Sequence, residues 1–433
     1  MAVFVILAVC AFCLTYVWYQ YRFTYWTRRG VFSPKPVFPF GNIKEVVKRK
    51  AQFFQPYCDT YFKYKHLPYV GMYCFHRPVL CVNDLELAKH ILIKDFEYFQ
   101  SRGTFSGGVG DRLAGNLFNI HGPAWKKLRL KMSGMFTSGK LKTVYPMVEK
   151  IADDAKDYAD SLHTNGESIN FSELYGRYAM EIIANIGFGL ECNGFKSAKS
   201  EFYDRGHGVT GPHDFSFSMD DLAANTMLYM IAGYETSATT GQFTAYQLAL
   251  NPDIQNKVRE EIVRVLDKYG GKCTYEAQNE MVYFNMVLEE TMRMYPSMRA
   301  IFRRCTKDYR LPGTDLVIEK DTLVFVPCNS IQMDPEIFPE PHKYNPERFS
   351  PENKAKLHPC HWMPFGEGPR KCLGVRQGYI QSKMALVKIL PKYELVLDER
   401  TLVPMRIKTT SLVPQAEGDV WIKLRKLPQK HSS

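Results

Sequence analysis

The chain has 433 residues and a formal net charge of +11, with 45% hydrophobic and 14% aromatic residues. This composition can bury a large core, which excludes a disordered chain, and eleven cysteines are too few over this length for a disulfide scaffold. The positive charge indicates an acidic partner or an anionic membrane. Nucleic-acid binding is not expected, because no basic block is interleaved with aromatic residues.

The first 21 residues contain no charged side chain and are almost wholly apolar. A helix of about 20 such residues crosses the hydrocarbon core of a bilayer. Three arginines follow this segment: Arg22, Arg28 and Arg29. We therefore predict a single-pass membrane anchor over 1–21, with the rest of the chain on the cytosolic side. The aromatic residues expected at the membrane interface are Trp18, Tyr19, Tyr21 and Trp26.

A cleaved secretory signal is the alternative for this segment. It would need a basic start and a small-residue cleavage site, and the sequence has no evident example of either. Residues 22–40 are basic and contain Pro34, Pro36 and Pro39, which favour an extended spacer. We therefore expect a linker over 22–40 and a folded domain over 41–433.

Helical periodicity dominates that domain. The expected helices are 84–97, 122–136, 139–163, 171–187, 219–250, 252–268, 278–295 and 374–391. Strands are expected as a pair within 67–83, between 310 and 330, and at 393–397, 405–413 and 420–424. Ser218 is expected to cap the helix over 219–250. The pattern predicts a mainly α fold with a minor β part, in a single large helix-rich domain.

Residues 365–374 read FGEGPRKCLG and carry the most informative pattern in the chain. Two glycines and a proline predict a tight loop that a large, flat ligand can approach closely. A helical pattern opens directly after Cys372, so its sulfur is expected near a helix amino end beside Arg370 and Lys371. Such a setting lowers the pKa of a thiol and favours the thiolate.

Two other interpretations of Cys372 stay open at this point. It could be a buried structural thiol. It could also bind zinc together with His358, Cys360 and His361, although their spacing matches no common zinc knuckle.

The loop has the order of the haem loop of the cytochrome P450 family, and the sequence resembles that family. Phe365, Gly368, Arg370, Cys372 and Gly374 fill every characteristic place. The resemblance implies the cytochrome P450 fold and a haem b cofactor (iron protoporphyrin IX), with Cys372 as the axial iron ligand. It also implies that Phe365 shields the sulfur and that Arg370 pairs with a haem propionate.

The resemblance assigns further propionate contacts to Trp125 and Arg129, which lie four residues apart on one helix face, and to Arg303 in a strand. Arg102 is a further candidate of the same kind. Each of these arginines alone is more often a surface residue, but several that converge would suit an anionic cofactor.

Residues 232–236 read AGYET, midway along the longest expected helix. The resemblance implies that Ala232 and Gly233 let the cofactor lie against this helix. It makes Glu235 and Thr236 the catalytic pair that delivers protons during dioxygen activation. The alternative is a glycine that packs against a neighbouring helix, with Thr236 bonded to its own backbone.

Glu290 and Arg293 are three residues apart on an expected helix and can pair. In the family such a pair lies in the core and is joined by a downstream arginine, which Arg348 supplies here. The resemblance therefore implies a structural network of these three residues that braces the cysteine loop.

The sequence departs from the family at 190–218, which shows no strong helical period. Family members carry two helices there that roof the substrate pocket, so several tens of residues are expected to be absent from this chain. A splice variant or an incomplete gene model would produce such a gap. The predicted consequence is an intact haem half whose substrate side is open to water.

The resemblance, which extends to the animal microsomal branch, implies a monooxygenase that inserts one oxygen atom of dioxygen into an apolar xenobiotic, steroid or fatty acid. The implied partners are membrane lipid, an NADPH-dependent flavoprotein reductase and a small cytochrome b-type carrier. A basic docking face for the reductase is expected at Lys126, Lys127, Lys371 and Arg376. The implied location is the endoplasmic reticulum membrane, with the catalytic domain on the cytosolic face.

The shortened segment leaves a second function open, that of an inactive relative that binds haem without turnover. A haem-thiolate isomerase or a peroxide-using enzyme is disfavoured, because Glu235 and Thr236 are present for dioxygen activation.

Overall fold

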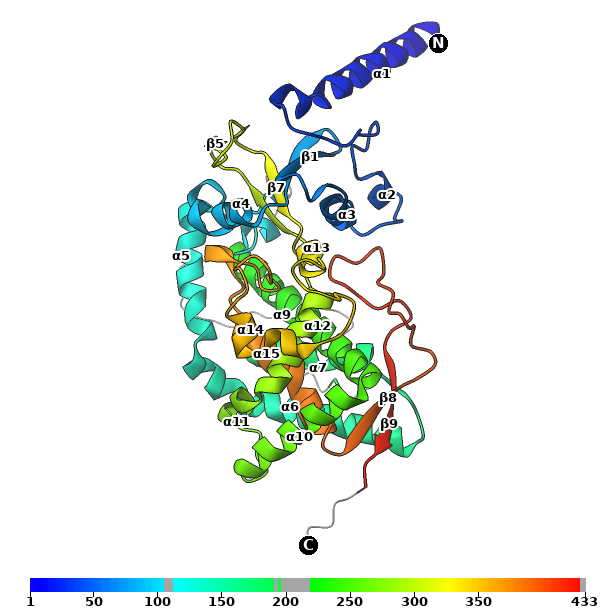
Figure 1. Cartoon of the computed structure of the whole chain (residues 1–433), viewed down its shortest axis with the longest axis vertical. Coiled ribbons are helices and arrows are strands. Elements are labelled where there is room, and N and C mark those ends of the chain that lie inside the picture. Colours follow the sequence, from blue (N-terminus) through cyan, green and yellow to red (C-terminus); the bar gives the residue numbers. More distant parts are fainter. Residues whose placement is uncertain (105–111, 191–193, 196–218, 429–433) are drawn as a thin grey trace.

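The computed structural model describes residues 1–104, 112–190, 194–195 and 219–428. Helices dominate, and the strands of the described residues form three small sheets, so the mainly α prediction is confirmed (Figure 1). Ser218, the expected helix cap, lies outside the described residues.

The helices and strands follow the predicted order along the chain. The α-helices are α1 Ala2–Arg22, α2 Lys44–Val47, α3 Gln55–Tyr64, α4 Leu85–Lys89, α5 Gly122–Ser133, α6 Ser138–Thr164, α7 Phe171–Phe188, α9 Met219–Leu250, α10 Pro252–Lys268, α11 Tyr275–Glu280, α12 Val282–Met294, α13 Cys328–Gln332, α14 Pro351–Lys354 and α15 Val375–Ile389. The strands are β1 Tyr69–Cys74, β2 Arg77–Val82, β3 Ile169–Asn170, β4 Ile301–Arg304, β5 Tyr309–Arg310, β6 Val317–Ile318, β7 Leu323–Val326, β8 Tyr393–Leu397 and β9 Trp421–Lys426.

Three predicted elements differ in the structure. The helix expected over 278–295 is divided at Met281 into α11 and α12. The pattern over 84–97 forms α4, a π-helical turn at His90–Lys94 and a 3₁₀ turn at Phe96–Tyr98 instead of one helix. The strand expected over 405–413 reduces to a single bridge between Ile407 and Ala416. Pro404 and Pro414 flank this segment, and a proline has no N–H to donate to a strand ladder.

The largest core lies between the helices α6, α7, α9, α10, α12 and α15. Within it, glycines set the closest approach of α7 and α9. A Cβ atom at Gly241 of α9 would lie 2.0 Å from the ring of Tyr175, and one at Gly187 of α7 would lie 2.5 Å from the ring of Tyr229. The start of α7 thus contacts the second half of α9, and the end of α7 contacts the first half. The two helices therefore run antiparallel.

The largest sheet has the strand order β1-β2-β7-β4. β1 and β2 pair antiparallel, as the sequence predicts for a pair within 67–83, and β2 pairs with β7 in parallel. β4 pairs antiparallel with β7 and is joined to Ser101 by a bridge at Arg304. This sheet therefore brings Arg303 of β4 close to the segment that contains Arg102.

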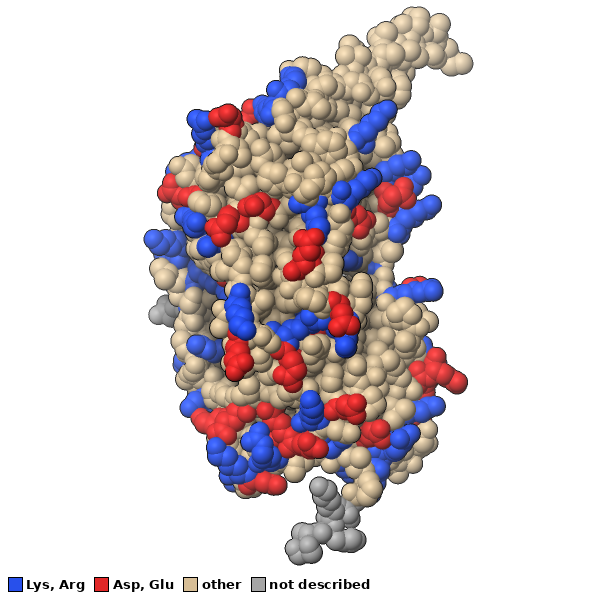
Figure 2. All heavy atoms as spheres, in the orientation of Figure 1, with Lys and Arg blue, Asp and Glu red and all other residues tan. Residues whose placement is uncertain are grey.

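Helix α1 has no buried side chain, and it is the one helix in the described ranges that is long and apolar enough to cross a membrane. It projects from the body as an uncharged rod, and basic side chains lie where it meets the body (Figures 1 and 2). An amino-terminal helix of this kind indicates a membrane anchor.

The segment after α1 packs more tightly than a linker would. Phe23, Tyr25 and Trp26 are buried, and the indole N–H of Trp26 donates to the carbonyl of Met72 at 2.9 Å. Packing of the folded body therefore begins before residue 41, and Trp26 lies in the core instead of at the membrane interface. This packing could not be predicted from the sequence, because the packing partner in β1 lies far along the chain.

Replacement of Gly241 by alanine is expected to destabilise the protein by about 1–3 kcal/mol, because the added methyl group meets the buried Tyr175 ring. Gly139→Ala is the matched control, since its added Cβ meets no atom of the described residues within 4 Å apart from its chain neighbours and its own helix backbone. Urea unfolding of the two variants measures the difference. Equal unfolding midpoints would show that the glycine contact is not tight.

Candidate functional site

The cysteine loop is held in a shape that requires glycine. Gly368 has a φ of +75°, and a Cβ on it would lie 1.9 Å from the carbonyl oxygen of Leu92. The N–H of Cys372 donates to the carbonyl of Phe365 at 2.9 Å, which closes the loop. The Phe365 ring stacks on Tyr379 of α15 with centroids 5.7 Å apart. Helix α15 begins at Val375, so the expected position of Cys372 just before a helix is confirmed.

The side chain of Cys372 is exposed to solvent, although protein surrounds the sulfur on most sides. Burial raises the pKa of its thiol, and the N–H of Gly374 and the charges of Arg129 and Arg102 act in the opposite direction. The prediction that the setting lowers this pKa is therefore wrong for the protein alone. The sequence pattern identifies the favourable neighbours but not the extent of desolvation.

Four arginines converge beside this cysteine: Arg102, Arg129, Arg303 and Arg370. A guanidinium N–H of Arg129 donates to the carbonyl of Lys371 at 2.6 Å, and one of Arg102 donates to the carbonyl of Arg370 at 3.1 Å. The guanidinium of Arg370 lies 4.5 Å from the ring centroid of Trp125. The structure thus brings together residues from α5, β4 and two loops that the sequence places far apart.

These arginines are desolvated without a compensating acid. Burial lowers the pKa of Arg370, and the charges of Arg102, Arg303 and Arg129 lower it further. The buried Nε atoms of Arg303 and Arg370 have no hydrogen-bond partner, and within the described part of the chain no carboxylate pairs with any of the four. Buried like charges cost free energy unless an anion joins them. The cluster therefore fits a ligand that carries carboxylate or phosphate groups.

Haem fits the arginine cluster and the cysteine. It is flat, its two propionates are anionic, and its iron accepts a sulfur ligand. An accessible cysteine beside an unneutralised arginine cluster supplies both kinds of contact. The zinc alternative has no such support, because no three His, Cys, Asp or Glu side chains of the described residues form a metal-binding group.

Helix α9 turns the side chains of its AGYET segment in different directions. Ala232 is exposed, and the hydroxyl of Thr236 donates to the Ala232 carbonyl at 2.6 Å. The half-buried carboxylate of Glu235 accepts from the amide of Gln415 at 3.0 Å, and burial raises its pKa. Gly233 faces α7, where a Cβ would lie 2.3 Å from Ile183.

Gly233 thus packs against a neighbouring helix, as the alternative to cofactor contact predicted. Of Ala232 and Gly233, only Ala232 lies on the open side of α9. The hydrogen bond from the Thr236 hydroxyl to the Ala232 carbonyl also agrees with the alternative, in which Thr236 bonds to its own helix backbone. The hydroxyl is half-exposed, however, and remains within one helical turn of Ala232.

Hydrogen bonds tie this part of α9 to the cysteine loop at one point and to helix α15 at two. The amide oxygen of Asn225 accepts from the N–H of Leu117, whose carbonyl in turn accepts from Arg370 at 3.3 Å. Further along, the amide of Gln377 donates to the hydroxyl of Tyr229, and Ser237 donates to Gln381. Both glutamines belong to α15, the helix that follows Cys372. The open face of α9 is therefore fixed relative to the sulfur.

Glu290 and Arg293 form a fully buried ion pair on α12. The guanidinium donates to both carboxylate oxygens at 2.7 and 2.9 Å, and Arg348 lies 3.5 Å from the same carboxylate. The backbone N–H of Asn345 also donates to Glu290 at 2.9 Å. The three residues that the sequence grouped as a network do come together in the core.

Two residues that the sequence did not single out carry this network to the cysteine loop. The carbonyl of Gln332 accepts from Arg293 at 2.8 Å, while its side-chain oxygen accepts from the N–H of Met363 at 3.0 Å. The carboxylate of Glu289 accepts from the hydroxyl of Tyr379 at 2.6 Å. Glu289 stands next to the recognised pair, and no sequence pattern marks Gln332.

A mainly helical body with an accessible thiol beside uncompensated arginines has the features of a haem-thiolate protein. A sequence model of the cytochrome P450 family matches residues 32–210 and 208–421, and the chain therefore belongs to this family. Cytochromes P450 bind haem b and are monooxygenases, which places this protein among the oxidoreductases.

Curated relatives from insects match almost the whole chain. Cytochrome P450 6k1 of Blattella germanica is 34% identical, over 92% of this chain and 92% of its own. Probable cytochrome P450 6a23 of Drosophila melanogaster is 33% identical, over 94% and 95%. Cytochrome P450 6B2 of Helicoverpa armigera is 32% identical, over 96% and 97%.

These relatives also differ from this chain in length, which concerns the short segment at 190–218. The three alignments run over 485, 482 and 491 positions, more than the 433 residues of this chain, so the relatives contain residues that this chain lacks. The family match ends and restarts at 208–210, inside the segment that the sequence identified as shortened.

Arg293→Ala is expected to destabilise the fold by about 3–5 kcal/mol, because it leaves the Glu290 carboxylate buried without its partner. Arg310→Ala is the control, since Arg310 pairs with Asp315 on the surface and should change stability by less than about 1 kcal/mol. Chemical unfolding of both variants makes the comparison. If Arg293→Ala costs no more than the control, the pair does not brace the core.

Proposed function

We propose that this protein is a membrane-anchored haem-thiolate monooxygenase that acts on an apolar small molecule of the xenobiotic, steroid or fatty acid class. The observation that carries the proposal is the accessible sulfur of Cys372 beside four arginines that have no carboxylate partner in the described ranges. The family match independently supports the cofactor class.

In this proposal Cys372 ligates the haem iron, and Arg129, Arg303, Arg370 and Arg102 hold the propionates together with Trp125. Gly368 and Gly374 keep bulk away from the loop, and Phe365 supports it by its stacking on Tyr379. The bound haem would supply dioxygen activation with two electrons, one oxygen atom going to the substrate and the other to water. The arginines would orient the cofactor, because its two propionates are its anionic groups.

Glu235 and Thr236 would supply protons at the open side of α9. Burial raises the pKa of Glu235, so this carboxyl keeps a proton at a higher pH than an exposed one and can donate it. The hydroxyl of Thr236, the residue that follows Glu235, donates a hydrogen bond to the carbonyl of Ala232. A hydroxyl that rotates from this carbonyl toward the cofactor side can relay that proton.

Helix α9 also carries exposed apolar side chains, which support an apolar substrate. Met227 and Ile231 are 45% and 51% exposed, and they precede Ala232 on the helix. Exposed apolar side chains at this spacing suit a greasy ligand above the cofactor.

The electron donor that we propose is an NADPH-dependent flavoprotein reductase, with a small cytochrome b-type carrier as a second donor. Lys126, Lys127, Lys371 and Arg376 are all exposed, and the bond from Arg129 to the Lys371 carbonyl joins α5 to the cysteine loop. An acidic partner docked on this basic face would deliver electrons on the cysteine side.

We further propose that α1 anchors the protein in the endoplasmic reticulum membrane, with the catalytic domain on the cytosolic face. The anchor would span 1–21, and the arginines that follow it favour the cytosolic side.

The interrupted family match supports a second candidate, an inactive relative that binds haem without turnover. Closed active sites exclude water from the chemistry, and residues that roof the substrate pocket in the family are among those expected to be absent here. Thiolate-ligated haem without product formation would favour this candidate over the monooxygenase.

Cys372→Ser is expected to abolish the Soret band of thiolate-ligated haem in the reduced, carbon monoxide-bound protein. Cys360→Ala, which removes a buried thiol near the same loop, should keep that band. Difference spectra of the purified proteins provide the measurement. A band that survives Cys372→Ser unaltered would refute the proposed ligand.

Thr236→Ala is expected to lower the product formed per NADPH by at least about tenfold, with hydrogen peroxide formed instead. Thr240→Ala is the matched control, because its hydroxyl makes the same bond one turn further on, to the Thr236 carbonyl at 2.9 Å. Product and peroxide yields are measured with the reductase and a lipophilic probe substrate. Equal yields in the two variants would assign Thr236 a packing role only.

A further inference from the structure

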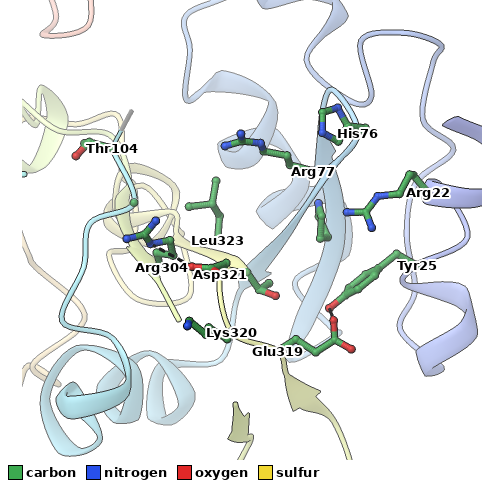
Figure 3. Close-up of a pocket in the computed structure, with 13 residues that line it drawn as sticks. Arg22, Tyr25, His76, Arg77, Thr104, Arg304, Glu319, Lys320, Asp321 and Leu323 are labelled. Atoms are coloured by element: carbon green, nitrogen blue, oxygen red, sulfur yellow. Dashed lines mark hydrogen bonds and ion pairs between the residues drawn. The ribbon is translucent and has the colours of Figure 1, made fainter. Parts of the chain in front are cut away.

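A cavity of about 540 Å³ lies where the end of α1 meets the folded body. Arg22, the last residue of α1, lies on one side, and His76 and Arg77 of the β1–β2 turn lie on another (Figure 3). The segment that leads into β7 contributes Lys320 and Asp321 to the lining. Its volume is in the range of small-molecule sites, about 300–1,000 Å³.

The lining of this cavity carries more positive than negative charge. Four cationic side chains, Arg22, Arg77, Arg304 and Lys320, face two acidic ones, Glu319 and Asp321. Both acids have partners of their own. Glu319 pairs with Arg29, which lies outside the lining, and accepts from the hydroxyl of Tyr25 at 3.0 Å, while Asp321 lies 3.7 Å from Arg304.

Two further observations concern the basic side chains of this lining. The buried Nε of Arg22 has no hydrogen-bond partner among the described residues. Burial lowers the pKa of His76, and the charges of Arg22 and Arg77 lower it further. An anion in the cavity would offer Arg22 a hydrogen-bond acceptor. It would also offset the repulsion between a protonated His76 and the charges of Arg22 and Arg77.

The position of the cavity indicates where such an anion comes from. Trp18 and Tyr21 in the last turns of α1 are 46% and 59% exposed, and Phe75 in the neighbouring turn is 42% exposed. The Trp18 ring lies 4.9 Å from the ring of His76, a residue that lines the cavity. Aromatic residues at the end of an apolar helix mark the headgroup level of a bilayer.

We propose that this cavity binds the phosphate headgroup of an anionic phospholipid, whose acyl chains then lie along the apolar surface of α1. The proposal rests on the membrane anchor but not on the haem chemistry. Bound lipid would tie the end of the anchor to the β1–β2 turn and β7, and so fix the orientation of the body on the membrane.

The test uses the full chain in phosphatidylcholine nanodiscs that contain a trace of photoreactive phosphatidic acid. The crosslink yield at residues 76–78 and 319–323 is compared with the yield from photoreactive phosphatidylcholine. We expect a preference for phosphatidic acid that falls by at least about tenfold in the double variant Arg77→Gln, Lys320→Gln, since each basic residue near anionic lipid contributes about fivefold.

The double variant Lys48→Gln, Lys50→Gln is the control, because it removes the same charge from exposed positions outside the cavity. It should keep the preference for phosphatidic acid within about twofold of the unaltered protein. An equal fall in both variants would overturn the proposal, because the attraction would then come from overall charge.

Inorganic phosphate separates the lipid from the free ion. Millimolar phosphate that abolishes the phosphatidic acid crosslink would identify a phosphate-ion site and overturn the lipid proposal. A crosslink that persists would support it. The reduced carbon monoxide spectrum of the same samples reports the haem site separately, so loss of lipid preference and loss of the cofactor are distinguishable.

Discussion

The arrangement of this protein depends on a group of like charges that no acidic side chain of the described residues neutralises. Arg102, Arg129, Arg303 and Arg370 lie together beside Cys372, and burial and mutual repulsion lower the pKa of Arg370. Such a cluster is stable only if the free energy of the surrounding fold outweighs its cost or if an anion joins it. We propose that this anion is haem, the cofactor of the family. Cofactor binding would then contribute to the stability of the protein.

The rest of the described structure holds this group in place. The Glu290–Arg293 pair reaches the cysteine loop through Gln332 and Met363, and Glu289 reaches it through Tyr379. Helix α9 is set against α7 by glycine contacts and against α15 by hydrogen bonds. Because a one-ångström shift in a reacting group can cost two orders of magnitude in rate, this bracing matters for the chemistry that we propose.

The sequence predicted most reliably the features that depend on residues close together in the chain. The FGEGPRKCLG loop was identifiable because Gly368 and Cys372 are defined by their neighbours in the chain, and α1 was identifiable from its uninterrupted apolar run. What depends on distant contacts was not predicted. Gly233 packs on Ile183, Trp26 is buried against β1, and desolvation raises the pKa of Cys372, because each outcome is decided by residues remote in sequence.

We propose that the arginine cluster selects an anionic porphyrin over an uncharged one. Titration of the cofactor-free protein with haem and with its dimethyl ester, whose propionates are uncharged, tests it most directly. If the four guanidinium groups hold the propionates, haem should bind at least about tenfold more tightly than the ester, and raised salt should narrow the difference. Equal affinities for the two porphyrins at low salt would contradict the account.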